Sequence, residues 1–308
     1  MERQLPELAA ALLAGWDAAL RARPCAPGLL LAVSGGPDSL ALLLAAKQLR
    51  EVRGLADGRT ITVATVDHAL RPESAKEAAE VAAICRDIGL SHHTLLWRRE
   101  GQVPTGNLQG TAREARYRLL ASHARRQGAG LVATGHHFGD QLETCALALE
   151  RGASGAALAG MRAWRDLAPG RILLRPFLHL HRTTLHEALR ITTWPVSDDP
   201  SNHDIRFSRV RIRKVLEETQ ERRPVVERLT AASRQRNESD AAQAAELSAL
   251  ERSGRLGVRP DGVIDFEGRG DFGSNLLSRC VTAAGGGIYP PARPAVDGLL
   301  RNLQSQRT

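Results

Sequence analysis

Six consecutive residues, Ser34 to Ser39, have the composition of an anion-binding turn. They read Ser-Gly-Gly-Pro-Asp-Ser and lie between two apolar runs, Leu29 to Val33 and Leu40 to Ala46, which predicts a strand, a tight turn and the start of a helix. Two glycines let the backbone approach a ligand closely, and the unpaired N–H groups at a helix start attract anions. The segment therefore predicts a phosphate site built mainly from backbone amides.

The side chains of this turn add donors and one carboxylate. The serine hydroxyls are donors for phosphate oxygens, and Asp38 is a candidate ligand for Mg²⁺. No lysine follows the glycines, so this is not the common phosphate loop, whose Gly-Lys-Ser/Thr ending reaches the β- and γ-phosphates. An ordinary glycine turn is the alternative interpretation. The candidate nucleotide-binding residues of the turn are Ser34, Gly35, Gly36, Pro37, Asp38 and Ser39.

Two polar residues, Asp67 and His68, follow the apolar run Ile61 to Val66, where a second strand is expected to end. The carboxyl ends of parallel strands meet at one edge of a sheet, and ligands bind at that edge. Asp67 and His68 are therefore expected to lie near the turn described above and to contribute to nucleotide binding.

A later segment, Gly135 to Thr144, follows another expected strand and opens a helix. Within it, Asp140 and Glu143 are three residues apart, so they share a helix face and can hold a cation between them. Two alternatives remain open. His136, His137 and Asp140 have the residue types of a metal site, and Asp140 can instead cap the helix start beside two surface histidines.

Strand-like and helical patterns alternate along the first two thirds of the chain. A capping box, Ser74 with Glu77, predicts one helix start, and an arginine-rich helix is expected from about Leu108 to Gln127. This alternation predicts an α/β fold with a doubly wound parallel sheet. The expected strands are 29–33, 61–66, 94–96 and 131–134, and a further helix is expected over 39–49.

The pattern changes at about Lys214. Helical sequence broken at Pro224 is followed by an alanine-rich helical stretch, Ala231 to Leu250, a turn-rich stretch and two short helical patterns. We therefore predict a catalytic domain over residues 1–213, and a linker helix with a small, mainly helical C-terminal domain over residues 214–308.

The charge of the chain favours a polyanionic partner. The 308 residues include 42 basic and 34 acidic side chains, a net charge of +8. Ten basic and only four acidic residues lie between Arg206 and Arg236, which makes this stretch the candidate nucleic-acid contact. A solvated arginine face is the alternative.

The four cysteines are far apart and form no Cys-x-x-Cys pair, so neither a disulfide framework nor a cysteine-held cluster is predicted. No uninterrupted apolar segment is long enough to cross a membrane. We therefore expect a cytoplasmic protein with no membrane partner.

The motifs between residues 28 and 215 resemble, in order, those of the tRNA(Ile)-lysidine synthetases, which are ATP pyrophosphatases with a Ser-Gly-Gly-x-Asp-Ser loop. Besides that loop, the matching segments are Gly106-Asn107-Leu108, Ala112-Arg113-Glu114-Ala115-Arg116-Tyr117, Thr134-Gly135-His136-His137, Asp140-Gln141, Glu143-Thr144, Arg175-Pro176-Phe177-Leu178, and Asp199-Pro200-Ser201-Asn202 followed by Arg209, Ile212 and Arg213.

The resemblance implies a Rossmann-like fold of the adenine nucleotide alpha hydrolase type, and a ligase that uses ATP and Mg²⁺. Such enzymes adenylate the wobble cytidine of tRNA(Ile) with a CAU anticodon, and L-lysine then displaces AMP to give lysidine. Carried over by residue, Asp140 and Glu143 recognise lysine and Arg113 places the adenylated intermediate. Asp38 and Arg209 complete the catalytic set, and the small C-terminal domain binds tRNA. A monomer or a homodimer is compatible with the resemblance.

Two positions depart from the family pattern. Gly139 stands where an aspartate is usual, and Val210 follows Arg209 where an asparagine is usual. The missing carboxylate bears on metal binding and rate more than on the fold. Two other enzyme classes remain as alternatives: a sulfur-inserting tRNA ATP pyrophosphatase, disfavoured because only Cys145 lies near the motifs, and a small-molecule amidating ligase. The lost carboxylate adds a third, a catalytically impaired tRNA-binding homologue.

Overall fold

The computed structural model describes residues 5–23, 25–55, 58–68, 73–98, 108–197, 204–217, 222–259, 263–266, 273–285 and 291–305. The chain divides into two compact units, Met1–Leu229 and Thr230–Thr308. The domain boundary between residues 213 and 214 stays a prediction. Among the described residues, no helix combines the length and the apolar character needed to cross a membrane.

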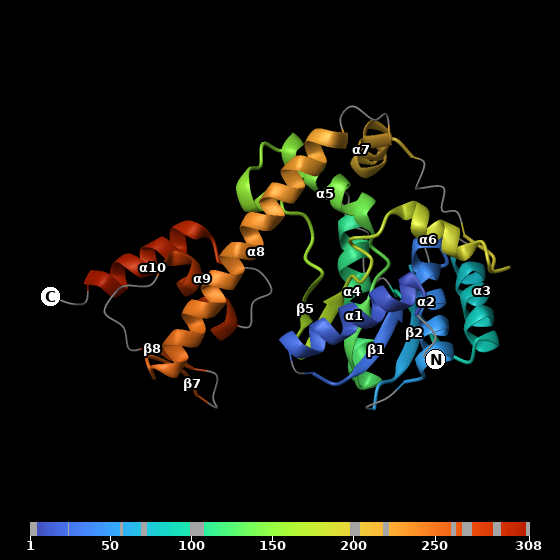
Figure 1. Cartoon of the computed structure of the whole chain (residues 1–308), viewed down its shortest axis with the longest axis horizontal. Coiled ribbons are helices and arrows are strands. Elements are labelled where there is room, and N and C mark those ends of the chain that lie inside the picture. Colours follow the sequence, from blue (N-terminus) through green and yellow to red (C-terminus); the bar gives the residue numbers. More distant parts are fainter. Residues whose placement is uncertain are drawn as a thin grey trace. The chain divides into compact units, whose positions relative to one another are not determined.

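A six-stranded sheet forms the centre of the first unit (Figure 1). Its strand order is β3-β2-β1-β4-β6-β5. Five of the strands run parallel, and β5 pairs antiparallel with β6 at one edge. The parallel sheet confirms the predicted fold class. The strands are β1 (Gly28–Ala32), β2 (Ile61–Asp67), β3 (Ser91–Leu96), β4 (Ala129–Ala133), β5 (Trp164–Ala168) and β6 (Arg171–Leu174).

Helices cover both faces of this sheet. Side chains alternate between the two faces along each strand, and the strands are apolar, so both faces must be buried. Leu29 and Leu31 of β1 pack into a core with α1 (Glu7–Ala22), α2 (Pro37–Arg53), α3 (Glu73–Asp87) and α6 (Arg182–Leu189). Leu30 packs on the opposite face, in a second core with α4 (Leu108–Arg126).

One expected helix start differs in the structure. Helix α3 begins at Glu73, so Ser74 lies in its first turn and not before it. The Ser74 hydroxyl donates a hydrogen bond to Asp67 Oδ1 at 2.6 Å. This links the start of α3 to the end of β2.

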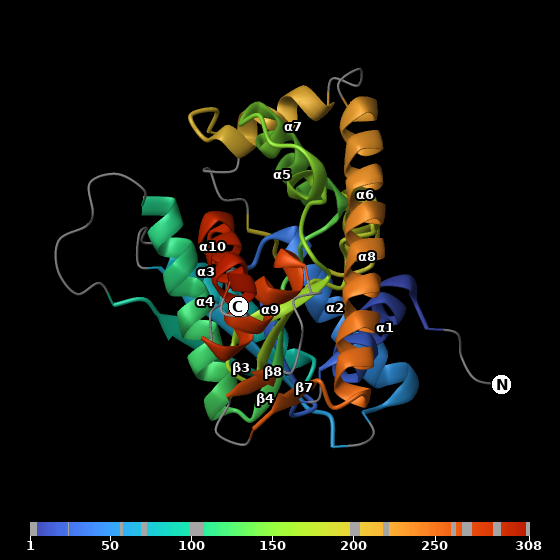
Figure 2. The ribbon, with the colours of Figure 1, turned by 90° about the vertical axis from the view of Figure 1, so that its left-hand side faces the viewer.

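The expected break at Pro224 is wrong. Pro224 lies in the first turn of α8 (Arg222–Arg252), where a backbone N–H would have no intrahelical acceptor, so its absence breaks no helical hydrogen bond. Helix α8 continues without interruption through the alanine-rich stretch (Figure 2).

The second unit is mainly helical, as predicted. Its described elements after α8 are α9 (Ser274–Ala284), α10 (Arg293–Ser305) and an antiparallel pair of short strands, β7 (Leu256–Val258) and β8 (Ile264–Phe266). The strand pair was not predicted, because three-residue strands carry almost no periodic signal.

Candidate active site

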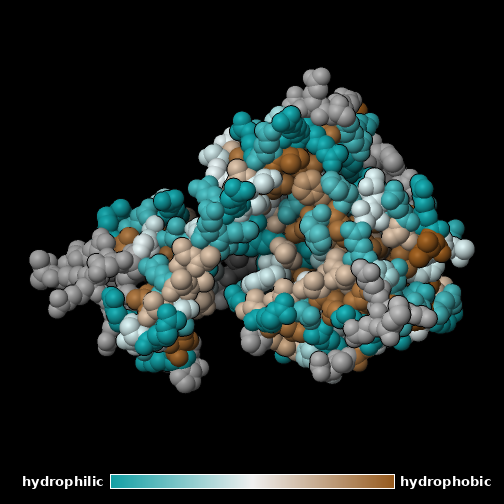
Figure 3. Space-filling view, in the orientation of Figure 1, coloured by the Kyte–Doolittle hydropathy of each residue, from teal (hydrophilic) through white to brown (hydrophobic). Residues whose placement is uncertain are grey.

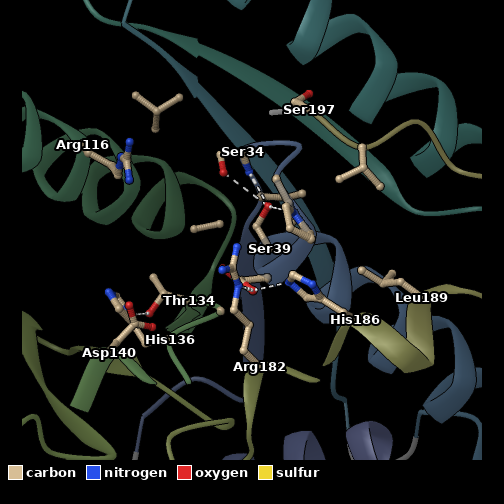
Figure 4. Close-up of a pocket in the computed structure, with 18 of the residues that line it drawn as sticks. Ser34, Ser39, Arg116, Thr134, His136, Asp140, Arg182, His186, Leu189 and Ser197 are labelled. Carbon is tan, nitrogen blue, oxygen red and sulfur yellow. Dashed lines mark hydrogen bonds and ion pairs between the residues drawn. The ribbon is translucent and has the colours of Figure 1, made fainter. Parts of the chain in front are cut away.

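The turn after β1 has the conformation that its glycines permit. Gly35 has a φ of +91°, which L side chains rarely adopt, and a Cβ there would lie 2.8 Å from Ser197 Oγ. The Ser197 N–H also donates to the Gly35 carbonyl at 3.0 Å. Ser197 therefore packs directly against the loop (Figure 4).

The Ser39 hydroxyl closes this loop. Ser39 Oγ accepts the Ser34 N–H at 3.1 Å and donates to the Gly36 carbonyl at 2.8 Å. Ser34 Oγ lies 3.3 Å from Ser39 Oγ. Helix α2 begins at Pro37, which suits a first helical turn. The expected strand, turn and helix start are thus all present, and phosphate binding by this loop stays a prediction.

Gly135 brings the end of β4 against the start of α2. A Cβ at Gly135 would lie 2.2 Å from the Asp38 carbonyl oxygen, so only glycine allows this approach. The sequence-predicted segment after β4 therefore lies beside the phosphate loop, as the shared sheet edge requires.

Asp38 is surrounded by basic side chains. Its carboxylate oxygens lie 3.1 Å from His186 Nε2, 3.6 Å from His137 Nε2 and 3.8 Å from Arg182 Nε. Burial raises the pKa of Asp38, but His137, Arg182 and His186 outweigh burial and lower it overall. Asp38 is therefore ionised at neutral pH.

Two of these partners, Arg182 and His186, were missed by the sequence reasoning. They are four residues apart on α6, so they share one helix face. No motif marks them, and only the packing of α6 against α2 brings them to Asp38. The i, i+4 spacing of two basic residues was the one available signal.

His137 caps α5 (Phe138–Glu150). Its Nδ1 accepts the Gly139 N–H at 3.0 Å, and Asp140 Oδ2 accepts the His137 N–H at 2.9 Å, which forms a reciprocal capping box. Burial lowers the pKa of His137, but Asp38 and Asp140 raise it overall. His137 is buried, so the interpretation of surface histidines beside a cap is wrong for this residue.

A cavity of about 840 Å³ lies over the phosphate loop. Guanidinium and ammonium groups outnumber carboxylates in its walls, which suits a polyanionic ligand. The charged lining residues are Arg113, Arg116, Arg182, Arg190, Arg213, Lys214, Asp38, Asp140 and Glu217. The sequence-predicted residues Ser34, Asp38, Arg113 and Asp140 thus border one space. Figure 4 shows Ser34 and Asp140 in its walls.

Glu143 does not line this cavity, although Asp140 does. Glu143 is 2% exposed, and its Oε1 accepts Arg213 Nε at 2.7 Å, while Oε2 is buried without a hydrogen-bond partner. Arg213 comes from α7 (Ser208–Glu217) and does line the cavity. The Arg213 guanidinium therefore already takes one oxygen of the carboxylate that the sequence assigns to lysine.

His136 is a neutral histidine in a positive environment. Its Nδ1 lies 2.8 Å from Thr134 Oγ1. Burial lowers the pKa of His136, Asp140 opposes this, and Arg175, Arg113 and Arg209 lower it further, so the pKa falls well below its usual range. The two predicted arginines, Arg113 and Arg209, thus both act electrostatically on His136.

His68 contacts Arg116, which lines the cavity. Arg116 Nε and Nη2 lie 3.3 Å and 3.2 Å from His68 Nε2. Burial, with the charge of Arg116, lowers the pKa of His68 to about 4. Asp67 and His68 are not among the cavity-lining residues, so their predicted nucleotide contacts stay a prediction.

Among the described residues, no three His, Cys, Asp or Glu side chains are grouped to hold a metal ion. The alternative metal site of His136, His137 and Asp140 is therefore not formed. Mg²⁺ differs, because one or two carboxylates suffice where phosphates supply other ligands. The ionised Asp38 fits that role. The motif residues 106–107 and 199–202 lie outside the described residues.

The fold and the loop together define a PP-loop protein, and residues 17–219 match the family model described as a PP-loop domain. Membership of this class implies the use of ATP. More narrowly, the chain belongs to the tRNA(Ile)-lysidine synthase family, as its relatives show.

One such relative, from Methylobacterium nodulans, is 40% identical over 276 residues, which cover 87% of this chain and 78% of that protein. A second, from Methylobacterium sp. strain 4-46, is 43% identical and aligns with 79% of this chain and 68% of its own length. A third, from Bradyrhizobium diazoefficiens, is 46% identical, and the alignment spans about half of it, 52%. All three are named tRNA(Ile)-lysidine synthase.

A solved structure supports the fold alone. The U34-tRNA thiolase of Methanococcus maripaludis superposes with a TM-score of 0.56 at 12% identity, covering 74% of this chain and 79% of that one. At that identity the likeness carries no information on substrate.

Proposed function

We propose that this protein joins L-lysine to C2 of the wobble cytidine of tRNA(Ile) with a CAU anticodon, and that it forms AMP and pyrophosphate from ATP. The observation that carries the proposal is the shared cavity: the phosphate loop, Arg113 and Asp140 border it, in a chain of the tRNA(Ile)-lysidine synthase family.

In the first step, cytosine O2 attacks the α-phosphorus of ATP. An O–P bond forms, the bond from the α-phosphorus to the bridging oxygen breaks, and pyrophosphate leaves. The loop amides and Arg182 are suited to hold the departing charge, since preorganised donors stabilise charge that develops during reaction. Mg²⁺ would be held by Asp38 together with the phosphates, and would neutralise part of that charge.

In the second step, the lysine amine attacks C2 of the adenylated cytidine. A C–N bond forms, the C–O bond breaks, and AMP leaves with the oxygen. The amine must lose a proton, and Asp140 and His136 both border the cavity. Thr134 Oγ1 donates to the Leu174 carbonyl at 3.5 Å, which leaves it to accept from Nδ1–H of His136. His136 Nε2 is then the free acceptor, although burial and the nearby arginines lower the pKa of His136 and make it a weak base.

Lysine recognition is assigned chiefly to Asp140. Asp140 borders the cavity, whereas Glu143 is buried behind Arg213. Asp140 and Glu143 are three residues apart on one face of α5, and Glu143 Oε2 has no hydrogen-bond partner, so Glu143 is the second candidate for the lysine ammonium. The proposal therefore ranks Asp140 above Glu143 as the carboxylate that binds the lysine ammonium.

The tRNA is expected to contact the basic stretch and the second unit. Arg209, Arg211 and Lys214 of α7 are exposed, and the surface over α7 is hydrophilic (Figure 3). Exposed guanidinium groups without buried partners are suited to phosphate contacts, which position a nucleic acid without reading its bases.

Pyrophosphate release from ATP tests the proposal. Release that requires both tRNA(Ile) and lysine is expected, with lysine incorporated into the tRNA in equal amount. Release with a sulfur donor in place of lysine, release without tRNA, or no release at all would reject it in favour of the thiolase, amidating or non-catalytic alternatives. No cysteine lines the cavity among the described residues, and burial raises the pKa of Cys145, which speaks against sulfur insertion.

A further inference from the structure

Three guanidinium groups gather around one phenol ring beside the cavity. Arg113 and Tyr117 are four residues apart on α4, and the guanidinium carbon of Arg113 lies 5.1 Å from the centre of the Tyr117 ring. The guanidinium carbon of Arg165, from β5, lies 5.6 Å from the same centre. Arg175 follows β6 and lies close enough to Tyr117, Arg165 and Arg113 for their charges to act on its guanidinium group. We call these four residues the arginine–tyrosine cluster.

The strand register explains why they meet. Arg165 pairs with Leu173, and Leu173 packs in the core beneath α4. Arg175 is two residues further along, and its N–H donates to the Ala163 carbonyl at 2.7 Å. Residues two apart on a strand face the same side. Arg165 and Arg175 therefore both face α4, which contacts β5 and β6.

Arg175 is a buried cation without a carboxylate partner. Its side chain is 4% exposed, Nη1 donates to the Arg162 carbonyl at 2.8 Å, and Nε is buried with no hydrogen-bond partner. In the described part of the chain, no carboxylate forms an ion pair with Arg113, Arg165 or Arg175. Burial of an unpaired charge beside two like charges is costly unless an anion completes the site.

We infer that the arginine–tyrosine cluster binds a phosphodiester of the RNA substrate, next to the nucleotide that reacts. This inference rests on the proposed function. Arginine binds phosphate oxygens through two parallel N–H groups, and stacking on an aromatic face leaves those N–H edges free.

We assign this phosphate to the RNA because the reaction has two phosphate-bearing substrates and the loop already offers a site for one of them. The amide donors of the Ser34–Ser39 loop are already available to the triphosphate of ATP. Arg113 and Tyr117 line the same cavity, so a second phosphate site there suits the second phosphate-bearing substrate. The depressed pKa of His136, caused by burial and, among other charges, by Arg175 and Arg113, reports the same positive potential.

The test uses the full chain with Arg165→Gln and a matched control, Arg171→Gln. Both arginines lie on the β5–β6 pair, and each donates to a neighbouring carbonyl, Asp166 at 2.8 Å and Gly170 at 2.6 Å. Only Arg165 belongs to the cluster, so the pair separates the cluster from the general effect of removing one charge.

Binding of unmodified tRNA(Ile) transcript and of ATP is measured at several salt concentrations. For Arg165→Gln we expect tRNA affinity to fall about tenfold and the slope of log affinity against log salt to flatten by about one unit, with ATP affinity unchanged. Arg171→Gln should keep the wild-type slope. These binding readouts need no turnover, so they stand even where pyrophosphate release fails to support the proposed reaction.

Two results would overturn the inference. If both variants bind tRNA alike, the cluster is not an RNA site. If Arg165→Gln loses ATP affinity and keeps tRNA affinity, the phosphate belongs to the nucleotide.

Arg175→Met supplies a second measurement. A cation kept for a ligand should be replaceable without loss of stability, so the free variant should melt at or above the wild-type temperature. The rise in melting temperature on adding tRNA should shrink. A lower melting temperature with an undiminished rise would instead assign Arg175 a purely structural role.

Discussion

Replacing Glu143 by glutamine should weaken both the fold of the first unit and its response to lysine. Glu143 is 2% exposed and bonds Arg213 at 2.7 Å, so the pair links α5 to α7. Breaking a fully buried pair costs about 3–5 kcal/mol. The Arg213 side chain keeps 30% exposure and can turn to solvent, so we expect about 2 kcal/mol in the free energy of unfolding.

A double-mutant cycle isolates that interaction. Glu143→Gln, Arg213→Gln and the double variant are unfolded in urea, and the coupling energy is taken from the four free energies of unfolding. The double variant should be no less stable than Glu143→Gln alone, because the unpaired charge is gone. A coupling energy below about 0.5 kcal/mol would refute the view that the pair holds α7 on α5.

The lysine requirement distinguishes the two carboxylates. Asp140→Asn should raise the lysine concentration needed for half-maximal pyrophosphate release, because a cation loses its partner. Glu143→Gln should raise it less, since Arg213 already takes one carboxylate oxygen. An unchanged requirement in Asp140→Asn would leave the capping box as the sole role of that residue.

Three further outcomes are expected. Asp38→Asn should abolish pyrophosphate release and leave tRNA affinity within about twofold, as measured by filter binding. His123 is 4% exposed, and burial, with nearby positive charges, lowers its pKa from 6.5 to about 4. As the pH drops through this window the unfolded state binds a proton first, so the free energy of unfolding should fall by at most about 3 kcal/mol. His123→Gln should remove this loss, as measured by urea unfolding at several pH values. Replacing Arg222, Arg223 and Arg228 together by glutamine should weaken binding of correct and incorrect tRNAs alike and flatten the salt slope by up to about three units, while ATP affinity is unchanged.

The central sheet was predictable because each buried strand is a short apolar run bounded by turn residues. Leu29 to Val33 and Ile61 to Val66 are of this kind, and both form strands within a residue of the expected bounds. Strand β5 is not, since Trp164–Ala168 mixes charged and apolar residues and is held mainly by pairing with β6. Edge strands of this kind depend on tertiary contacts that local sequence does not encode.

The candidate site divides in the same way. Ser34 to Ser39 and Asp140 were predictable because the first segment comes just after β1 and Asp140 lies in the first turn of the helix that follows β4, and the carboxyl ends of parallel strands meet at one sheet edge. Arg182, His186 and Arg175 were not assigned roles at Asp38 or Tyr117, because each role exists only through packing. Arg182 and His186 contact Asp38 because α6 packs against α2, and Arg175 lies near Tyr117 because α4 packs over β5 and β6.

Gly139 shows how a departure from a family pattern can have a local compensation. From the sequence alone, Gly139 is only the loss of a carboxylate. In the structure a Cβ at this position would lie 2.7 Å from His137 Cε1, so an aspartate there would force the ring to move. Without that Cβ, the His137 ring caps α5 and lies 3.6 Å from Asp38 and 3.8 Å from Asp140. His137 thus contacts both Asp38 and Asp140. Gly139, which stands where the family usually has an aspartate, leaves the room that this position of the His137 ring requires.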